Sequence, residues 1–355
     1  MSAFMKEAAM RLHPRLAAAI ATAAMLVLAT AAQASTPAPV RTTHANEMLP
    51  AGGYGGRAGS EFLTWSRSRP GARSTYDAYL QRNGGPVVKL NKRGVGYAGD
   101  VDVSEHLAVY QQVRNHDSRI MFYDWKAKTR YAAPEEVNTP EWEFAPRIQG
   151  DYLLFGRETW RNGSERYELL LFNRADGTVT SLDTIPYGYD YGVVDPGQMT
   201  GDWVVWRKAV ENWAEQRVYR HNIVTGVTDE VPSAAGRNDF GASVTADGTV
   251  YFVRSPGGCQ SVRIRSFTGA EGTSTTLVYA LRPGHEISNT YAEGRPDGST
   301  HLLFDRLACN ASMANWNIYR LLVGDGALPP QSAVRSASAG SSVAPAPAAD
   351  QRLHH

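Results

Sequence analysis

The sequence predicts an all-β protein, a six-bladed β-propeller built from four-stranded antiparallel blades. The main observation is an internal repeat, in which an acidic or polar turn precedes a short apolar strand that ends in an aromatic residue. Six copies occur, 45 to 52 residues apart, and they end at Trp65, Tyr110, Phe155, Trp206, Phe252 and Phe304. The second observation is that few stretches have the periodicity of a helix. A repeat of this length without helices is typical of a propeller.

Each copy of the repeat continues with the same elements. A polar connector leads to a second strand, and a tight turn that often contains glycine leads to a third. The stretch before the next acidic turn supplies the fourth strand. A twisted four-stranded sheet has two apolar faces and is unstable alone, whereas a ring of six buries each face against a neighbour. The strands DYLLF and DWVVW are apolar on both faces, as this packing requires.

The N-terminus has the features of a secretory signal peptide. Lys6, Arg11 and Arg15 form a basic segment, an alanine-rich apolar run starts at Leu16, and an A-x-A site ends at Ala34. The apolar run is too short and too rich in alanine for a membrane span. We therefore expect cleavage after Ala34, an exported protein and no membrane anchor.

The remaining chain divides into three parts. Residues 35–52 form an N-terminal segment, 53–323 the propeller, and 324–355 an Ala/Ser/Pro-rich tail that we expect to be disordered. The sixth copy of the repeat has no clear third strand after NIYRLLV. Residues 35–52 could supply the missing outer strand and so close the ring.

Two copies of the repeat carry a family resemblance. The stretches NDFGASVTADGTVYFV and SNTYAEGRPDGSTHLLF resemble the WD40-like repeat of TolB-type six-bladed propellers, with Asp247-Gly248 and Asp297-Gly298 at the motif's turn. The other copies keep the strand but have QGD, TGD, GSE or VSE instead. The resemblance implies the propeller fold over about residues 53–323. The α/β domain of TolB is not expected in the short segment before the first blade, so its translocation role is not implied.

Chain direction places two sets of loops on one face of the predicted propeller, which we call the connector face. These are the loops that lead from one blade into the next and the connectors in the middle of each blade. Long, varied loops on a rigid scaffold are where binding usually resides. An aromatic residue and a small one begin each predicted inner strand, which we interpret as packing between blades: Tyr54-Gly55, Tyr97-Ala98, Phe144-Ala145, Tyr191-Gly192, Phe240-Gly241 and Tyr291-Ala292.

Further residues near the connector face are not explained by the repeat. Aromatic rings beside carboxylates suit stacking on sugar rings or gripping a peptide, and the alternative is packing at the rim without a ligand. His285 is also the one histidine that we would test as a general base. The predicted binding residues are Trp142, Trp160, Tyr187, Tyr189, Asp190, Trp213, His285 and Glu286.

Acidic residues also gather near this face and the predicted channel. Asp100 and Asp102 alternate on a strand and share one side, so they could bind Ca²⁺ through oxygen ligands, and the alternative is a solvated polar lining. No other cofactor is expected. Glu143, Asp195 and Asp239 belong to the same group of acids. Carboxylates about 5 to 10 Å apart would suit a glycoside hydrolase or lyase.

Charge and cysteine content narrow the class of protein. The whole chain has a net charge of +1, and removing residues 1–34 takes away three basic residues and Glu7, which leaves about −1. No basic block is present, so nucleic-acid binding has no electrostatic basis. Cys259 and Cys309 lie at the same offset in consecutive blades, and in an exported protein we expect them to form a disulfide.

These observations predict a secreted, monomeric propeller with a non-catalytic binding or scaffold role. The expected ligand is a glycan or a peptide or protein segment, held on the connector face. The alternative is an extracytoplasmic carbohydrate-active enzyme, a glycoside hydrolase or lyase that uses carboxylates lining the channel.

Overall fold

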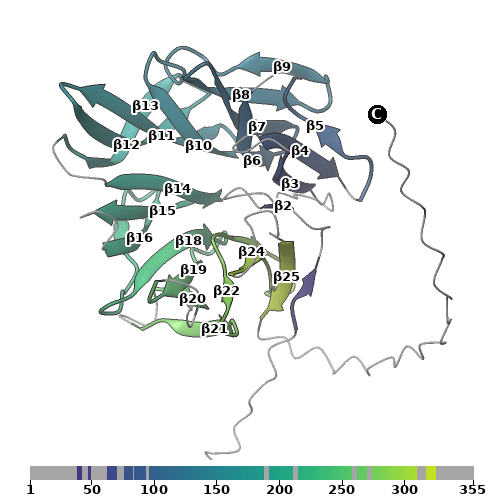
Figure 1. The fold of residues 1–355 in the computed structure, drawn as a ribbon, viewed down its shortest axis with the longest axis vertical. Helices are drawn as coiled ribbons and strands as arrows, with labels where there is room; N and C mark the ends of the chain where they lie inside the picture. Colours follow the sequence, from purple (N-terminus) through teal and green to yellow (C-terminus); the bar gives the residue numbers. More distant parts are fainter. Residues whose placement is uncertain are drawn as a thin grey trace, which may run out of the picture.

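The computed structural model describes residues 38–41, 47–48, 62–69, 76–82, 84–92, 96–187, 192–210, 215–257, 262–269, 274–309 and 317–324. The predicted signal peptide and the tail beyond residue 324 lie outside this part. Within it the protein is all-β, and six antiparallel sheets surround a common centre (Figure 1). The predicted six-bladed propeller is confirmed. No helix in the described ranges has the length and apolar character needed to cross a membrane.

Blades 1 to 3 each contain four strands that follow one another in the chain and in the sheet. Blade 1 contains β2 (Glu47–Met48), β3 (Phe62–Ser68), β4 (Tyr76–Arg82) and β5 (Val88–Lys89). Blade 2 contains β6 (Tyr97–Ser104), β7 (Leu107–Arg114), β8 (Asp117–Asp124) and β9 (Thr129–Ala132). Blade 3 contains β10 (Trp142–Gln149), β11 (Tyr152–Arg161), β12 (Ser164–Asn173) and β13 (Thr178–Ile185).

Blades 4 and 5 follow the same order, and blade 6 departs from it. Blade 4 contains β14 (Val193–Thr200), β15 (Trp203–Val210), β16 (Glu215–Asn222) and β17 (Thr228–Glu230). Blade 5 contains β18 (Asn238–Val244), β19 (Val250–Ser255), β20 (Arg263–Phe267) and β21 (Thr276–Ala280). Blade 6 contains β22 (His285–Glu286), β23 (Thr290–Gly294), β24 (Thr300–Ala308), β25 (Asn317–Val323) and β1 (Val40–Arg41).

The N-terminal segment completes the ring. β1 pairs antiparallel with β25, with Val40 opposite Arg320, and is the outermost strand of blade 6. β2 pairs with β3, with Glu47 opposite Arg67, so the first strand of blade 1 starts before residue 53, the predicted start of the propeller. The segment around residues 40–48 therefore contributes to the last blade and to the first, which ties the two ends of the ring together.

Within the described ranges the apolar core consists of six clusters, one at each contact between neighbouring blades. Between blades 2 and 3, for example, Val109 and Phe122 pack against Ile148 and Phe155. The aromatic residues that end the six repeats are all at most 2% exposed: Trp65, Tyr110, Phe155, Trp206, Phe252 and Phe304. Burial at equivalent positions is the physical reason that the repeat is visible in the sequence.

The first strands of blades 2 to 5, which are β6, β10, β14 and β18, contact one another in order around the centre, and β18 also contacts β23 of blade 6. In blades 2 to 5 this strand carries a β-bulge against the second strand, as between Phe144 and Arg147. Asp100 and Ala145 adopt left-handed φ angles of 50° and 49° at these bulges. A bulge bends a strand and changes the direction of its side chains, and here it accompanies polar residues at the centre.

The interpretation of the aromatic–small pairs as one sixfold position is wrong. Phe144 lies opposite Gly156 directly before a bulge, whereas Tyr97 lies opposite Val113, well before the bulge of its strand. Blades differ in strand length and bulge position, so a similar place in the sequence is not the same place in the sheet. Phe144 does pack closely within blade 3. Its ring covers Gly156, where an added Cβ would lie 2.2 Å from the ring. Tyr54 and Tyr191 lie outside the described residues.

Candidate functional site

A two-residue hairpin sets the geometry of blade 3 on the connector face. Asn162 and Gly163 join β11 to β12 with φ angles of 52° and 80°, the left-handed pair that a tight β-hairpin turn requires. Arg161 is therefore opposite Ser164, and the pairing continues without interruption through both strands. Every side chain on these two strands consequently has a defined cross-strand partner.

Aromatic and acidic side chains alternate on one side of this sheet. Trp142 of β10 is opposite Glu158 of β11, which is opposite Tyr167 of β12. Nearer the hairpin, Trp160 is opposite Glu165. Directly paired residues point to the same face of a sheet, so these five residues share one side. We call them the blade 3 rim.

The blade 3 rim lies on the side of the sheet that faces blade 4. Tyr167 packs against the apolar cluster between these blades, which includes Val194 and Trp206. Trp160 is 52% exposed, and Tyr187, two residues beyond the end of β13, is 39% exposed. Aromatic surface is therefore available to a ligand on this part of the connector face.

Hydrogen bonds orient the rim side chains. The Trp160 indole Nε1–H donates to Glu158 Oε1, and the Tyr167 hydroxyl donates to Glu165 Oε2 at 2.6 Å. Partial burial raises the pKa of Glu158, and the charge of Glu165 adds to this effect. Burial and the same two carboxylates raise the pKa of Tyr167. The rings and carboxylates thus hold one another in place before any ligand arrives.

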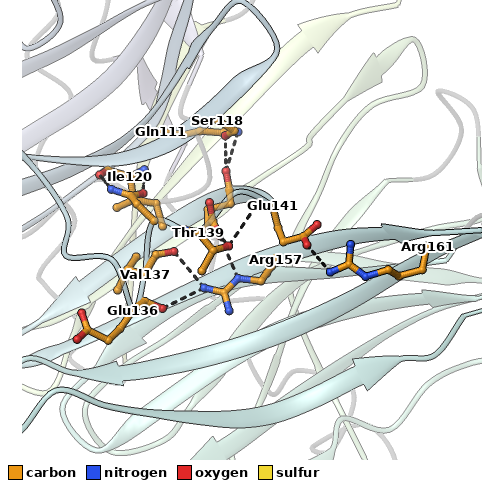
Figure 2. Close-up of polar contacts among 11 residues, drawn as sticks. Gln111, Ser118, Ile120, Glu136, Val137, Thr139, Glu141, Arg157 and Arg161 are labelled. Atoms are coloured by element: carbon orange, nitrogen blue, oxygen red, sulfur yellow. Dashed lines mark hydrogen bonds and ion pairs between the residues drawn. The ribbon is translucent and has the colours of Figure 1, made fainter.

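The opposite side of blade 3 contains an arginine clamp, shown in Figure 2. Glu143 is fully buried, and its Oε1 accepts from Arg157 Nε at 3.0 Å and from the Thr139 hydroxyl at 2.6 Å. Arg157 also donates to the carbonyls of Glu136 and Val137, both at 3.1 Å. Arg157 therefore ties the inner strand, the second strand and the loop between blades 2 and 3 together. Burial raises the pKa of Glu143, which Thr139 and Arg157 partly offset.

The same acid–arginine pairing recurs in the next two blades. Asp195 is opposite Arg207, at 2.7 Å, and Asp239 is opposite Arg254, also at 2.7 Å. A small pocket between blades 4, 5 and 6 is lined in part by the first of these pairs. These acids are neutralised by arginine side chains on the adjacent strand. Each of these ion pairs joins the first and second strands of its own blade.

Side chains fill the centre of the propeller. Gln198 of blade 4 donates to the carbonyl of Ala292 in blade 6 at 2.7 Å and accepts from the Ala292 N–H at 2.9 Å. Arg147 of blade 3 is fully buried and donates to the carbonyl of Pro196 at 3.2 Å. The Gln198 contacts join blades 4 and 6, which are not neighbours in the ring, and the Arg147 contact joins blades 3 and 4.

Asp100 and Asp102 belong to this central group. Burial raises the pKa of Asp102 to about 6 against the opposing effect of Arg147, and Asp102 accepts from the Ile148 N–H at 2.9 Å. Burial likewise raises the pKa of Asp100. No set of three or more His, Cys, Asp or Glu side chains in the described ranges is placed to hold a metal ion. Binding of Ca²⁺ by Asp100 and Asp102 stays a prediction. The buried Arg147 belongs to the same central group.

The structure brings some of the predicted binding residues together. Trp142 and Trp160 are in the blade 3 rim, and Tyr187 follows the outer strand of the same blade. Tyr189, Asp190, Trp213 and Cys259 lie outside the described residues, so their predicted roles and the disulfide stay predictions.

His285 and Glu286 form β22 in blade 6, which is opposite blade 3 in the ring. His285 Nε2 accepts from Arg306 at 2.7 Å, and burial together with the Arg306 charge lowers the pKa of His285. His285 Nε2 therefore already accepts a hydrogen bond from Arg306. The role of His285 as a general base stays a prediction.

Three residues of the rim were missed by the sequence analysis, namely Glu158, Glu165 and Tyr167. A signal for them was present. Asn-Gly between two strands indicates a two-residue hairpin, and that turn alone pairs Trp160 with Glu165 and Glu158 with Tyr167.

Comparison with known proteins supports the fold alone. No family model and no curated protein matches the sequence. A protein of unknown function from Dyadobacter fermentans has a TM-score of 0.53 at 10% identity, over 81% of this chain and 98% of its own. TolB from Acinetobacter baumannii has a TM-score of 0.46 at 13% identity over 74% of this chain, which spans 64% of that protein. An oligogalacturonate lyase from Vibrio parahaemolyticus has a TM-score of 0.46 at 11% identity, over 80% and 92%.

Replacing Arg157 with methionine should lower the free energy of unfolding by about 3 kcal/mol, because it leaves the buried Glu143 carboxylate without its cation. Arg161→Met is the matched control. Arg161 pairs with Glu141 at 2.7 Å but its side chain is 61% exposed, so its loss should cost less than about 1 kcal/mol. Urea denaturation of both variants measures the difference, and equal effects would show that the clamp has no structural role.

The buried Asp102 should make the protein more stable in mild acid. Its pKa is raised from 3.8 to about 6 on folding, so protonation favours the folded state. That contribution is complete below about pH 4 and is lost as the pH rises to about 6, by about 3 kcal/mol in total. In Asp102→Asn the dependence should disappear, so wild type should lose about 2 kcal/mol of that total relative to the variant between pH 4 and pH 7. Asp151 is exposed, so the control Asp151→Asn should show the same pH dependence of the free energy of unfolding as wild type. The same wild-type dependence in Asp102→Asn would contradict the prediction.

Proposed function

We propose that this chain is an exported, non-catalytic binding propeller that recognises a glycan or a peptide segment through the blade 3 rim. The observation that carries the proposal is the exposed indole of Trp160, held on a rigid hairpin beside Trp142 and Tyr167. Tryptophan and tyrosine supply large contact areas at a low cost in conformational entropy, and they dominate the energetics of many binding surfaces.

Preorganisation supports a binding role for these rings. Burial and cross-strand pairing hold Trp142 and Tyr167, and the bond to Glu158 restrains the Trp160 indole. A ligand that stacks on rings already in position loses less free energy to ordering the site. Sugar rings and peptide side chains both present surfaces that stack on an indole.

The charged groups near the centre argue for binding rather than catalysis. Glu143, Asp195 and Asp239 are each engaged by an arginine, and the charge of the buried Arg147 acts on both Asp100 and Asp102, where it opposes the rise of their pKa on burial. A general acid or base must reach the atom that it protonates, and these carboxylates are occupied or enclosed. We therefore do not favour the carbohydrate-active enzyme.

The proposal includes export of the protein. Two predicted features support export, the signal peptide and the Cys259–Cys309 disulfide. Oxidation of thiols to disulfides is typical of compartments outside the cytoplasm. Intact-mass measurement of the chain recovered from the extracytoplasmic fraction tests both. The mass should correspond to a chain that starts at Ser35, and it should rise by about 2 Da on reduction, because each sulfur of a cleaved bridge gains one hydrogen. An unprocessed chain, or a mass insensitive to reductant, would contradict this part.

A screen of the full chain against glycan and peptide arrays tests the binding role. Trp160→Ala should reduce the affinity for the ligand at least about tenfold, and Trp142→Ala and Tyr187→Ala should also weaken it, because aromatic anchors at binding surfaces typically contribute more than about 1 kcal/mol. Tyr131→Ala is the matched control, since Tyr131 is 44% exposed but lies on the outermost strand of blade 2. Binding that survives each of these three changes would refute the choice of surface.

A further inference from the structure

The blade 3 rim carries two negative charges without a cation beside them. Glu158 and Glu165 accept hydrogen bonds from Trp160 and Tyr167, both of which are neutral. Among the described residues, neither carboxylate forms an ion pair with lysine, arginine or histidine. The two acids are separated by aromatic neighbours along and across the strands. This part of the connector face therefore places two carboxyl groups without a cationic partner next to exposed aromatic surface.

The basic residues in the same part of the chain are already paired with other acids. Arg161 contacts Glu141 at 2.7 Å, and Arg166 contacts Glu168 at 2.7 Å on the other side of the sheet. Lys208 of blade 4 contacts Asp183 at 2.6 Å. The segments 188–191 and 211–214, which fall outside the described residues, contain Asp190 and Glu211 and neither lysine nor arginine.

Aromatic rings and carboxylates in alternation attract one kind of chemical group. The face of an indole or phenol attracts a cation through its ring quadrupole, and a carboxylate forms its strongest hydrogen bonds with charged N–H donors. An uncharged sugar provides the stacking but leaves both negative charges uncompensated. A quaternary ammonium provides the charge but has no N–H for the carboxylate oxygens that remain free.

We propose that the blade 3 rim binds the side chain of an arginine or lysine in an extended peptide segment. The inference rests on the proposed function, because it uses the same surface, and it deepens that function by selecting a basic peptide over a neutral glycan. The guanidinium or ammonium group stacks on Trp160 and donates to Glu158 and Glu165. Because charge complementarity contributes, binding weakens as the salt concentration rises.

Isothermal titration of the full chain with a matched peptide series tests this. The probes are acetylated, amidated pentapeptides Ala-X-Ala-X-Ala in which X is arginine, lysine, citrulline or norleucine. Citrulline keeps the shape of arginine without its charge, and norleucine keeps the four-carbon chain of lysine without the ammonium group. The arginine and lysine peptides should bind at least about tenfold more tightly than their neutral counterparts, and the preference should decrease between 50 and 500 mM salt.

Variants of the chain separate the charge from the shape of the site. Glu158→Gln with Glu165→Gln keeps both side-chain sizes and should reduce the preference for arginine over citrulline at least about fivefold. Glu168→Gln, on the other face of β12, is the control and should leave the preference unchanged. Near-ultraviolet circular dichroism of each variant verifies that the tryptophan environment is retained.

The possible results distinguish failure of the basic-peptide inference from failure of the proposed binding function. Equal binding of charged and neutral peptides, no saturable binding of either basic peptide, or a preference that survives the double glutamine variant would overturn the inference. If a neutral glycan binds, loses affinity in Trp160→Ala and is indifferent to the glutamine changes, the binding function stands and the basic peptide is wrong. If no ligand of either class depends on Trp160, the proposed function fails as well.

Discussion

The structure depends on one constraint: a blade with two apolar faces must bury both of them against neighbouring blades. The six clusters between blades meet this constraint, and they use the same aromatic position of each repeat. In an open ring the first and last blades would each expose one apolar face, so the two ends must be joined. β1 and β2 provide that joint, because one segment of the chain pairs with the last blade and with the first. With the ring closed, the loops on the connector face are free to vary in sequence without loss of the core.

The same packing explains where a ligand has room. Arg147 and Gln198 fill the centre with contacts that bridge separate blades, and arginines from the second strands neutralise the acids of blades 3 to 5. Breaking such a buried pair is costly, so these groups are held to structural tasks. On the connector face, the blade 3 rim places the exposed indole of Trp160 beside carboxyl groups that have no cationic partner among the described residues, at a two-residue hairpin.

The repeat, the number of blades and the fold class were predictable from the sequence, because burial imposes the same residue type at the same place six times. Trp142, Trp160 and Tyr187 were predictable as exceptions to that repeat. Their neighbours Glu158 and Tyr167 follow only from the register of β11 and β12, which the Asn162-Gly163 turn encodes. The arginine clamps were not predictable, because they depend on bulges such as that between Phe144 and Arg147. The contact of Gln198 with Ala292 spans 94 residues, and no local pattern indicates it.

The central claim is that ligand recognition takes place at the blade 3 rim and not at the centre or the opposite face. The indole N–H groups report on this directly, because Trp160 donates to Glu158 in the rim while Trp125 donates to the carbonyl of Glu105 in the turns of the opposite face. Two-dimensional NMR of the ¹⁵N-labelled chain during titration with the arginine peptide distinguishes the two. If the rim binds the peptide, the Trp160 signal shifts with peptide concentration while that of Trp125 stays fixed. A shift of Trp125, or of the buried Trp206, with Trp160 unchanged would contradict it.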